Sequence, residues 1–230
     1  MPFSLPIYSL LNDPLTFLRN LLISAPAILI ALTLHELAHG LVAYWCGDPT
    51  AKLMGRLSLN PLKHLDPVGT VLLVLAGIGF AKPVPVNPRN FKKPRLYDFL
   101  VSIAGVTMNI ILFIIFGTAS LWYINFAPAQ YVNEYVYYFL TYCAQINASL
   151  AVFNLLPLPP LDGYHVVNDV LLKRPLFATQ RAMQIGEGIL LILLVTGLLD
   201  KYISFCLGDA DSGLWGALFY VFRSVAIRFI

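Results

Sequence analysis

The sequence is poor in charged residues: Asp, Glu, Lys and Arg together make up 12% of its 230 residues. That share is about half of what a soluble domain carries. Apolar residues account for 58% of the chain, and its mean hydropathy is +0.74. The composition excludes an ordinary soluble domain and indicates a protein that crosses a membrane several times.

Cysteine is also scarce, and the three cysteines are odd in number, far apart and surrounded by apolar residues. We therefore expect neither a disulfide nor a metal role for Cys46, Cys143 and Cys206. We expect no cleavable signal peptide, because the first apolar run begins after Arg19 and is too long for a signal core. The chain has no repeat, low-complexity segment, basic tail or charged linker. These absences predict one integral-membrane domain over residues 1–230, without an appended regulatory domain or a nucleic-acid partner.

The apolar residues gather in tracts long enough to span a bilayer. The tracts are Leu21–Cys46, Leu96–Phe126, Val132–Leu156, Ile185–Leu199 and the more marginal Leu214–Ile230. A shorter Gly-rich piece, Val68–Ala81, either crosses the membrane or re-enters it. We predict an all-α polytopic membrane bundle with about five to six transmembrane segments.

The charged residues that remain are distributed unevenly. Between Lys52 and Arg95 the chain has eight Lys or Arg residues and a single acid, Asp66. Since basic loops stay on the cytoplasmic side of a membrane, we expect residues 52–95 and the C-terminus to be cytoplasmic.

Apolar and polar residues alternate between Thr50 and Asn60, a pattern that is typical of a strand. Together with Val68–Val86, this segment predicts a small β-hairpin or sheet at the cytoplasmic mouth of the bundle. A free edge of such a sheet would bind an extended peptide by strand addition. A surface hairpin without that role is the equal alternative.

Three ionisable side chains stand inside the first apolar tract, in the sequence HELAH from His35 to His39. On a helix the two histidines are one turn apart, roughly 40° around the axis, and Glu36 projects roughly 60° from His39. Two neutral imidazoles with a carboxylate beside them are what a zinc hydrolase uses to hold its metal and to take a proton from water.

The motif lies deep in its tract. His35 is roughly 21 Å of helix after Leu21 and roughly 16 Å before Cys46, whereas the hydrocarbon core is about 30 Å thick. A charge at that depth is costly, so these side chains must face protein, water or metal. We expect a metal well below the membrane surface.

A catalytic zinc takes three protein ligands, so HELAH lacks one. The candidates by chemistry are Glu134, Glu187, His64, His165, Asp98, Asp162 and Asp169. Asp162 lies in NLLPLPPLDG, Asn154–Gly163, whose prolines forbid a regular helix. Unwound backbone at membrane depth must be buried or line a wet cavity. We therefore expect Asn154 and Asp162 to approach the metal, with Gly163 permitting a tight turn.

The two motifs together resemble the site-2 protease family of intramembrane zinc metalloproteases, which pair H-E-x-x-H with a distant N-x-x-x-x-x-P-x-D-G segment. HELAH matches the first half, and Asn154, Pro160, Asp162 and Gly163 match the second. Three connecting sequences are similar to the compact prokaryotic branch, although Val106 stands where that branch usually has proline. They are GRLSLNPLKHLDPVGT at Gly55–Thr70, FAKPVPVNP at Phe80–Pro88 and SIAGVTMN at Ser102–Asn109.

The resemblance implies that His35, His39 and Asp162 bind one zinc ion per chain, that Glu36 is the general base, and that Asn154 helps to hold the substrate or its oxyanion. It implies an endopeptidase that cleaves the transmembrane segment of a membrane-anchored protein. The partners expected are that substrate and the lipid bilayer. Its location would be a prokaryotic plasma membrane.

Further polar residues are expected to support the site rather than react. His64 would brace the loop after the first tract, and this is favoured over a direct catalytic role. Asn109 would form an interhelical hydrogen bond, with Gly105 allowing a close approach of the helices.

Two alternatives stay open. A CAAX-type membrane zinc protease also carries H-E-x-x-H but takes a later Glu as third ligand, and Glu134 and Glu187 lack a suitable context. A zinc-binding scaffold or inactive homologue is the other, against which the intact Glu36 argues.

Overall fold

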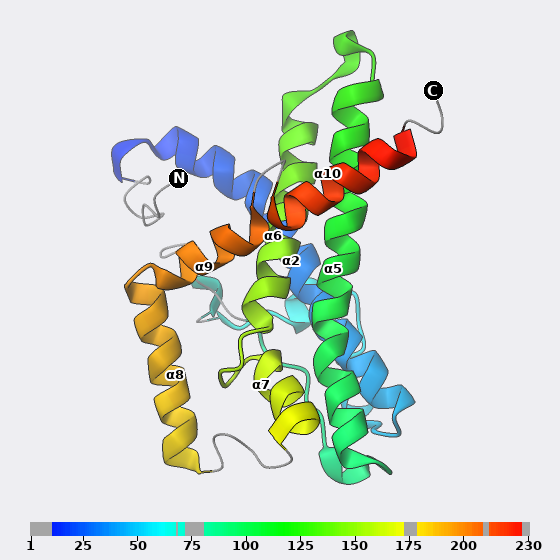
Figure 1. Ribbon diagram of the computed structural model, residues 1–230, viewed down its shortest axis with the longest axis vertical. Helices are drawn as coiled ribbons and strands as arrows, with labels where there is room; N and C mark the ends of the chain where they lie inside the picture. Colours follow the sequence, from blue (N-terminus) through cyan, green and yellow to red (C-terminus); the bar gives the residue numbers. More distant parts are fainter. Residues whose placement is uncertain (1–10, 68, 72–80, 173–178, 209–211, 227–230) are drawn as a thin grey trace.

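The computed structural model describes residues 11–67, 69–71, 81–172, 179–208 and 212–226, which are mostly helical (Figure 1). The longer helices are α2 (Pro14–Trp45), α5 (Pro94–Phe126), α6 (Glu134–Asn154), α8 (Gln180–Val195), α9 (Leu198–Leu207) and α10 (Gly213–Ala226). The short ones are α3 (Thr50–Leu53), α7 (Asp162–Val167), 3₁₀ turns at Pro61–Lys63, Pro88–Asn90 and Ala129–Tyr131, and a π-helical turn at Asn168–Leu172. The predicted helical class is confirmed.

Among the described residues, three helices are long and apolar enough to cross a membrane: α2, α5 and α6. Local signals begin each of them. Asp13 accepts from the Thr16 backbone N–H ahead of Pro14, α5 starts with Pro94 in its first turn, and Asn133 accepts from the Tyr135 N–H. The long apolar helices are those of an integral membrane protein.

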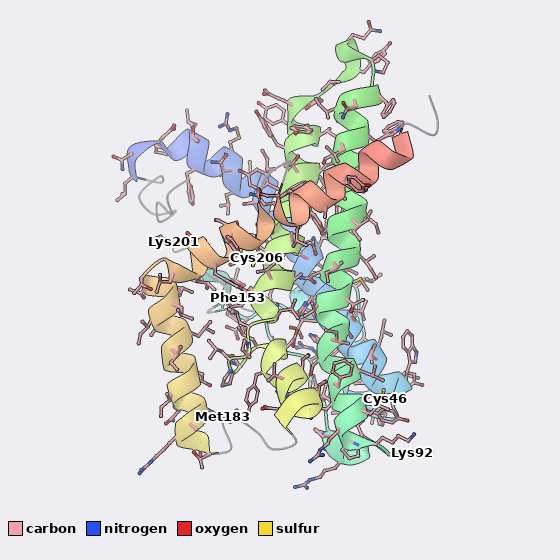
Figure 2. The ribbon with its side chains drawn as sticks, in the orientation of Figure 1. Cys46, Lys92, Phe153, Met183, Lys201 and Cys206 are labelled. Carbon is pink, nitrogen blue, oxygen red and sulfur yellow. The ribbon has the colours of Figure 1, made fainter. Side chains whose placement is uncertain are left out.

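These three helices form the body of the molecule. In Figure 1, α5 runs along most of its length, α6 lies beside α5, and α7 sits next to the lower part of α5. The helix α2 packs against both α5 and α6. In Figure 2, Cys46 after α2 and Lys92 before α5 lie at the same end of the molecule. There Phe91 and Val101 pack on Ala43 in a small apolar cluster.

The last helices lie differently from the predicted spans. The tract Ile185–Leu199 is interrupted where α8 ends at Val195 and Gly197 adopts a left-handed φ of 71°. The helices α8 and α9 therefore meet at 77°. The helices α9 and α10 cross α6 and α5 obliquely and cover an apolar cluster with them (Figure 1). With α8 and α9 counted as one span, the described residues hold at most four candidate spans. The predicted count of five to six is not confirmed.

The strand predicted from Thr50 to Asn60 is wrong. Residues Thr50–Leu53 form the helix α3 instead, followed by a turn in which Gly55 has a φ of 64°. The Asp48 carboxylate explains the difference, because it accepts from both the N–H and the hydroxyl of Thr50 and starts a helical turn. The described residues contain one isolated antiparallel bridge, between Leu65 and Ala81, and no sheet. Most of the predicted re-entrant piece Val68–Ala81 lies outside the described residues.

Candidate metal centre

Two histidines of α2 point to one place. His35 and His39 are one helical turn apart, both are buried, and their Nε2 atoms lie 3.0 Å from each other. The pattern of HELAH therefore produces the predicted pair on a single face of the helix.

Asp162 reaches this pair from another part of the chain. After α6 the backbone from Leu155 to Leu161 is not helical, and Asp162 opens α7. Its Oδ2 lies 3.4 Å from Nε2 of His35 and 3.3 Å from Nε2 of His39. This oxygen is buried and has no hydrogen-bond partner of good geometry among the described residues. The unwound segment delivers the carboxylate as the prolines predict.

The three ligand atoms fit a tetrahedral metal. Nitrogen and carboxylate ligands at about 2.0 to 2.2 Å from zinc are separated by roughly 3.3 to 3.6 Å in a tetrahedron. The separations here are 3.0, 3.3 and 3.4 Å. These residues form the one His, Cys, Asp and Glu group of this kind found within the described ranges. Two imidazoles and a carboxylate also match the ligand set of known catalytic zinc sites.

Hydrogen bonds at the far side of each ring prepare the histidines for a metal. The Nδ1 of His39 lies 2.7 Å from the Val101 carbonyl oxygen, which can only accept, so Nδ1 donates. The Nδ1 of His35 lies 3.1 Å from Oδ1 of Asn109, which also accepts. Both rings therefore keep the lone pair of Nε2 for a ligand bond. The interhelical hydrogen bond predicted for Asn109 is present.

Gly105 gives the rings their space. A Cβ atom at this position of α5 would lie 2.3 Å from Nε2 of His39 and 2.6 Å from Cε1 of His35. Glycine at this position therefore does more than let two helices approach, because it leaves room for both ligands.

Gly163 plays a corresponding part at Asp162. Its Cβ would lie 2.3 Å from the backbone oxygen of Leu155, at the end of α6. The segment predicted to need a glycine does need one, and the reason is close packing of backbone rather than a left-handed turn.

Glu36 lies beside the ligand pair and is half-buried. Its Oε2 accepts a hydrogen bond of 2.8 Å from the backbone N–H of Val84, in the segment between the bridge at Ala81 and α5. The contact joins residues that are 48 positions apart.

The chain is similar to known proteins. Residues 122–195 match the model of peptidase family M50. Over 195 residues the chain is 45% identical to a protein of Bacillus subtilis named "Putative zinc metalloprotease YwhC", covering 80% of this chain and 84% of that protein. The chain belongs to peptidase family M50. This family is the site-2 protease family predicted from the two motifs.

Two other relatives of this M50 peptidase are mycobacterial. A protein of Mycolicibacterium smegmatis named "Putative zinc metalloprotease Rip2" is 30% identical over 196 residues, 82% of this chain and 73% of that protein. The protein of the same name in Mycobacterium tuberculosis H37Rv is 28% identical over 187 residues, 80% of this chain and 69% of that protein. No solved structure matches this M50 peptidase significantly. The predicted class of enzyme, a metalloendopeptidase, is confirmed.

No hydrogen bond or ion pair in the described part of the M50 peptidase joins three further predicted residues to the ligand group. Asn154 ends α6, and its amide nitrogen donates to the Leu150 carbonyl at 3.0 Å. His64 is buried, and its Nε2 donates to the Ser58 carbonyl at 2.8 Å within the loop after α3. Pro160 is exposed and follows a cis peptide bond in the unwound segment. The hydrogen bond of His64 holds the loop after α3 together, whereas the role predicted for Asn154 stays a prediction.

A pair of side chains ties α7, and with it Asp162, to α5. The Nδ1 of His165 lies 3.2 Å from Oδ2 of Asp98, and this hydrogen bond raises the pKa of His165. Asp169 follows in the π-helical turn, where burial and the nearby Asp98 carboxylate raise its pKa to about 6. The polar side of α7 therefore faces the start of α5.

Sequence reasoning missed two backbone groups of the M50 site: the carbonyl of Val101 and the N–H of Val84. Backbone atoms carry no residue-specific signal, so only the fold reveals them. The prolines on either side of Val84 were a weak signal, because they leave its N–H as the single donor among residues 83–85.

Proposed function

We propose that this M50 peptidase is a zinc endopeptidase that hydrolyses a peptide bond in or near a transmembrane segment of a membrane-anchored protein. The observation that carries the proposal is the triangle of ligand atoms from His35, His39 and Asp162, two of which lie on a helix long enough to cross the membrane. The names of the relatives support zinc as the metal, and we propose one ion per chain.

The proposed residues have three separate roles in hydrolysis: metal binding, proton transfer and orientation of the imidazoles. His35, His39 and Asp162 would hold zinc, which when bound supplies Lewis-acid chemistry that acidifies water and polarises a peptide carbonyl. Glu36 would take a proton from the attacking water and deliver it to the amine that leaves. Asn109 and the Val101 carbonyl would keep the two imidazoles in the ligating tautomer.

Asn154 would help to hold the substrate or its oxyanion. A donated amide hydrogen bond to a developing oxyanion is worth about 2.7 to 4 kcal/mol in enzymes where such donors have been removed. The Asn154 amide would first exchange its bond to the Leu150 carbonyl for one to the substrate. Cleavage should therefore slow in Asn154→Ala.

The proposed location follows from depth and charge. His35 is roughly 16 Å of helix from Cys46 and roughly 21 Å from Leu21, so the ligands would lie inside the bilayer. The basic residues 52–95 and the C-terminus would face the cytoplasm of a prokaryotic cell. Substrates would come from the same plasma membrane.

A pair of variants tests the proposal. Glu36→Gln should keep about one zinc per chain by elemental analysis and abolish cleavage, whereas Asp162→Ala should lose zinc as well. New peptide termini in membranes of cells with the active enzyme, absent with Glu36→Gln, would reveal the substrates.

Glu134→Gln is the matched control, because Glu134 is exposed at the start of α6 and the substitution is the same. It should cleave normally. Full cleavage by Glu36→Gln would falsify the proposed chemistry. A Glu36→Gln protein that still replaced the wild type in cells would indicate a zinc-binding scaffold.

A further inference from the structure

The segment Ala81–Asn90, which we call the strap, passes over α2. Its last residues, from Asn87 to Asn90, are bound by a buried acid. Asp48 has no exposed surface. Its carboxylate accepts from the Asn87 backbone N–H at 2.7 Å and from the Asn90 side-chain amide at 2.6 Å. A buried carboxylate with several donors makes strong, directional bonds, so this end of the strap is fixed to the end of α2.

The start of the strap, at Lys82 and Pro83, is held as well. Arg56 is buried, and its guanidinium donates to the Lys82 carbonyl at 2.5 Å and to the Pro83 carbonyl at 3.3 Å. The Lys82 N–H donates to the carbonyl of His64 at 2.8 Å. The brace at His64 therefore supports the strap directly.

The middle of the strap meets α2 at Val84. The Val84 side chain is 8% exposed, and a Cβ at Gly40 would come within 3.2 Å of its Cγ1. Gly40 follows Glu36 by four residues, so the two lie on the same face of α2. Because Val84 packs against Gly40, its backbone N–H can donate to the Glu36 carboxylate, at 2.8 Å.

We propose that the backbone N–H of Val84 is a positioning group for Glu36. It holds Oε2 by a charge-assisted hydrogen bond and so leaves Oε1 as the oxygen that receives the proton of water. A base works only when it is within reach of the proton in the right orientation, and the doubly anchored strap supplies that constraint. This inference rests on the proposed function of Glu36.

The test removes the N–H without changing the side chain. The α-hydroxy analogue of valine, introduced at position 84 by nonsense suppression, replaces the amide N–H with an ester oxygen. Val84→Pro removes the same donor by ordinary mutagenesis but also replaces the valine side chain, so the ester is the decisive variant. The matched controls are the same two changes at Val86, which also follows a proline in the strap and whose N–H has no hydrogen bond recorded in the described part of the chain.

The assay uses a fluorogenic peptide that carries a cleavage site found by comparing active with Glu36→Gln membranes. Removal of the Val84 N–H should lower kcat at least tenfold while KM and zinc content change less than twofold. The changes at Val86 should leave all three values near those of the wild type. A structural role alone would change zinc content or KM instead.

A double-mutant cycle provides a second measurement of the contact between Val84 and Glu36. In a Glu36→Asp background, whose carboxylate is one methylene shorter, loss of the Val84 N–H should reduce kcat less than twofold further. An unchanged kcat in the position-84 ester overturns the inference, as does an equal loss in the Glu36→Asp background. If Glu36→Gln itself cleaves, the proposed function fails; if only the position-84 variants cleave normally, the inference alone fails.

Discussion

Gly105→Ala is the substitution for which the structure predicts the sharpest separation between stability and metal binding. The added methyl carbon would lie 2.3 Å from Nε2 of His39 and 2.7 Å from Nε2 of His35. Ordinary contacts between such atoms are about 3.5 Å, so α5 must withdraw by about 1 Å or both rings must turn. Either movement breaks the hydrogen bonds from the rings to Asn109 and to the Val101 carbonyl.

Gly105→Ala should affect zinc affinity far more than stability. Loss of one group that orients a metal ligand costs about 10 to 100-fold in metal affinity, and here two ligands are displaced together, so zinc affinity should fall at least about 100-fold. Overpacking costs about 1 to 3 kcal/mol of folding free energy, against which alanine gains about 1 kcal/mol of helix propensity over glycine. Stability should therefore fall only modestly.

The assay is zinc content after dialysis against a graded chelator, with thermal unfolding in detergent micelles alongside. Gly188→Ala is the matched control on α8, because a Cβ there meets nothing within 4 Å and should stabilise slightly. Gly117→Ala is the second control: its Cβ would meet the end of the Leu218 side chain at 2.4 Å, so it should destabilise packing but retain zinc. Normal zinc affinity in Gly105→Ala would refute the argument.

Two further predictions concern the supports of the ligands. Asn109→Leu should weaken zinc binding about 10 to 100-fold in chelator competition, because His35 loses the acceptor of its Nδ1 proton. Asn147 is also buried but bonds to its own helix, so Asn147→Leu should leave zinc binding unchanged. An unaltered zinc affinity in Asn109→Leu would contradict the tautomer assignment. Gly163→Ala should abolish stable zinc binding, since its Cβ would clash with the Leu155 carbonyl and push Asp162 away. Retention of zinc in this variant would show that the backbone at the end of α6 can move aside.

The parts of the site that were predictable are those set by local geometry. His35 and His39 share a helix face because they are four residues apart. The three prolines before Asp162 predicted a break, and after this break Asp162 comes close to His35 and His39. These inferences needed only the helix period and the conformational limits of proline.

The parts that failed depend on competition between local and distant contacts. The alternation after Thr50 was a real pattern, but the Asp48 carboxylate accepts from the Thr50 N–H where a helical turn begins, and it also binds Asn87 and Asn90. The bend at Gly197 was hidden inside an apolar tract because one glycine does not lower hydropathy. The Val84 contact joins backbone to side chain across 48 residues, which no local pattern encodes.

The ligand group also has a consequence for how the protein is made. Its two histidines come from α2, the groups that orient them come from α5, and the carboxylate comes from α7, so the binding site is complete only late in synthesis. A nascent chain that has inserted only its first helix would offer two histidines with neither fixed tautomers nor a third ligand. In the proposed enzyme, metal binding would therefore require that the helices have assembled, and an incompletely inserted chain would not become an active protease in the membrane.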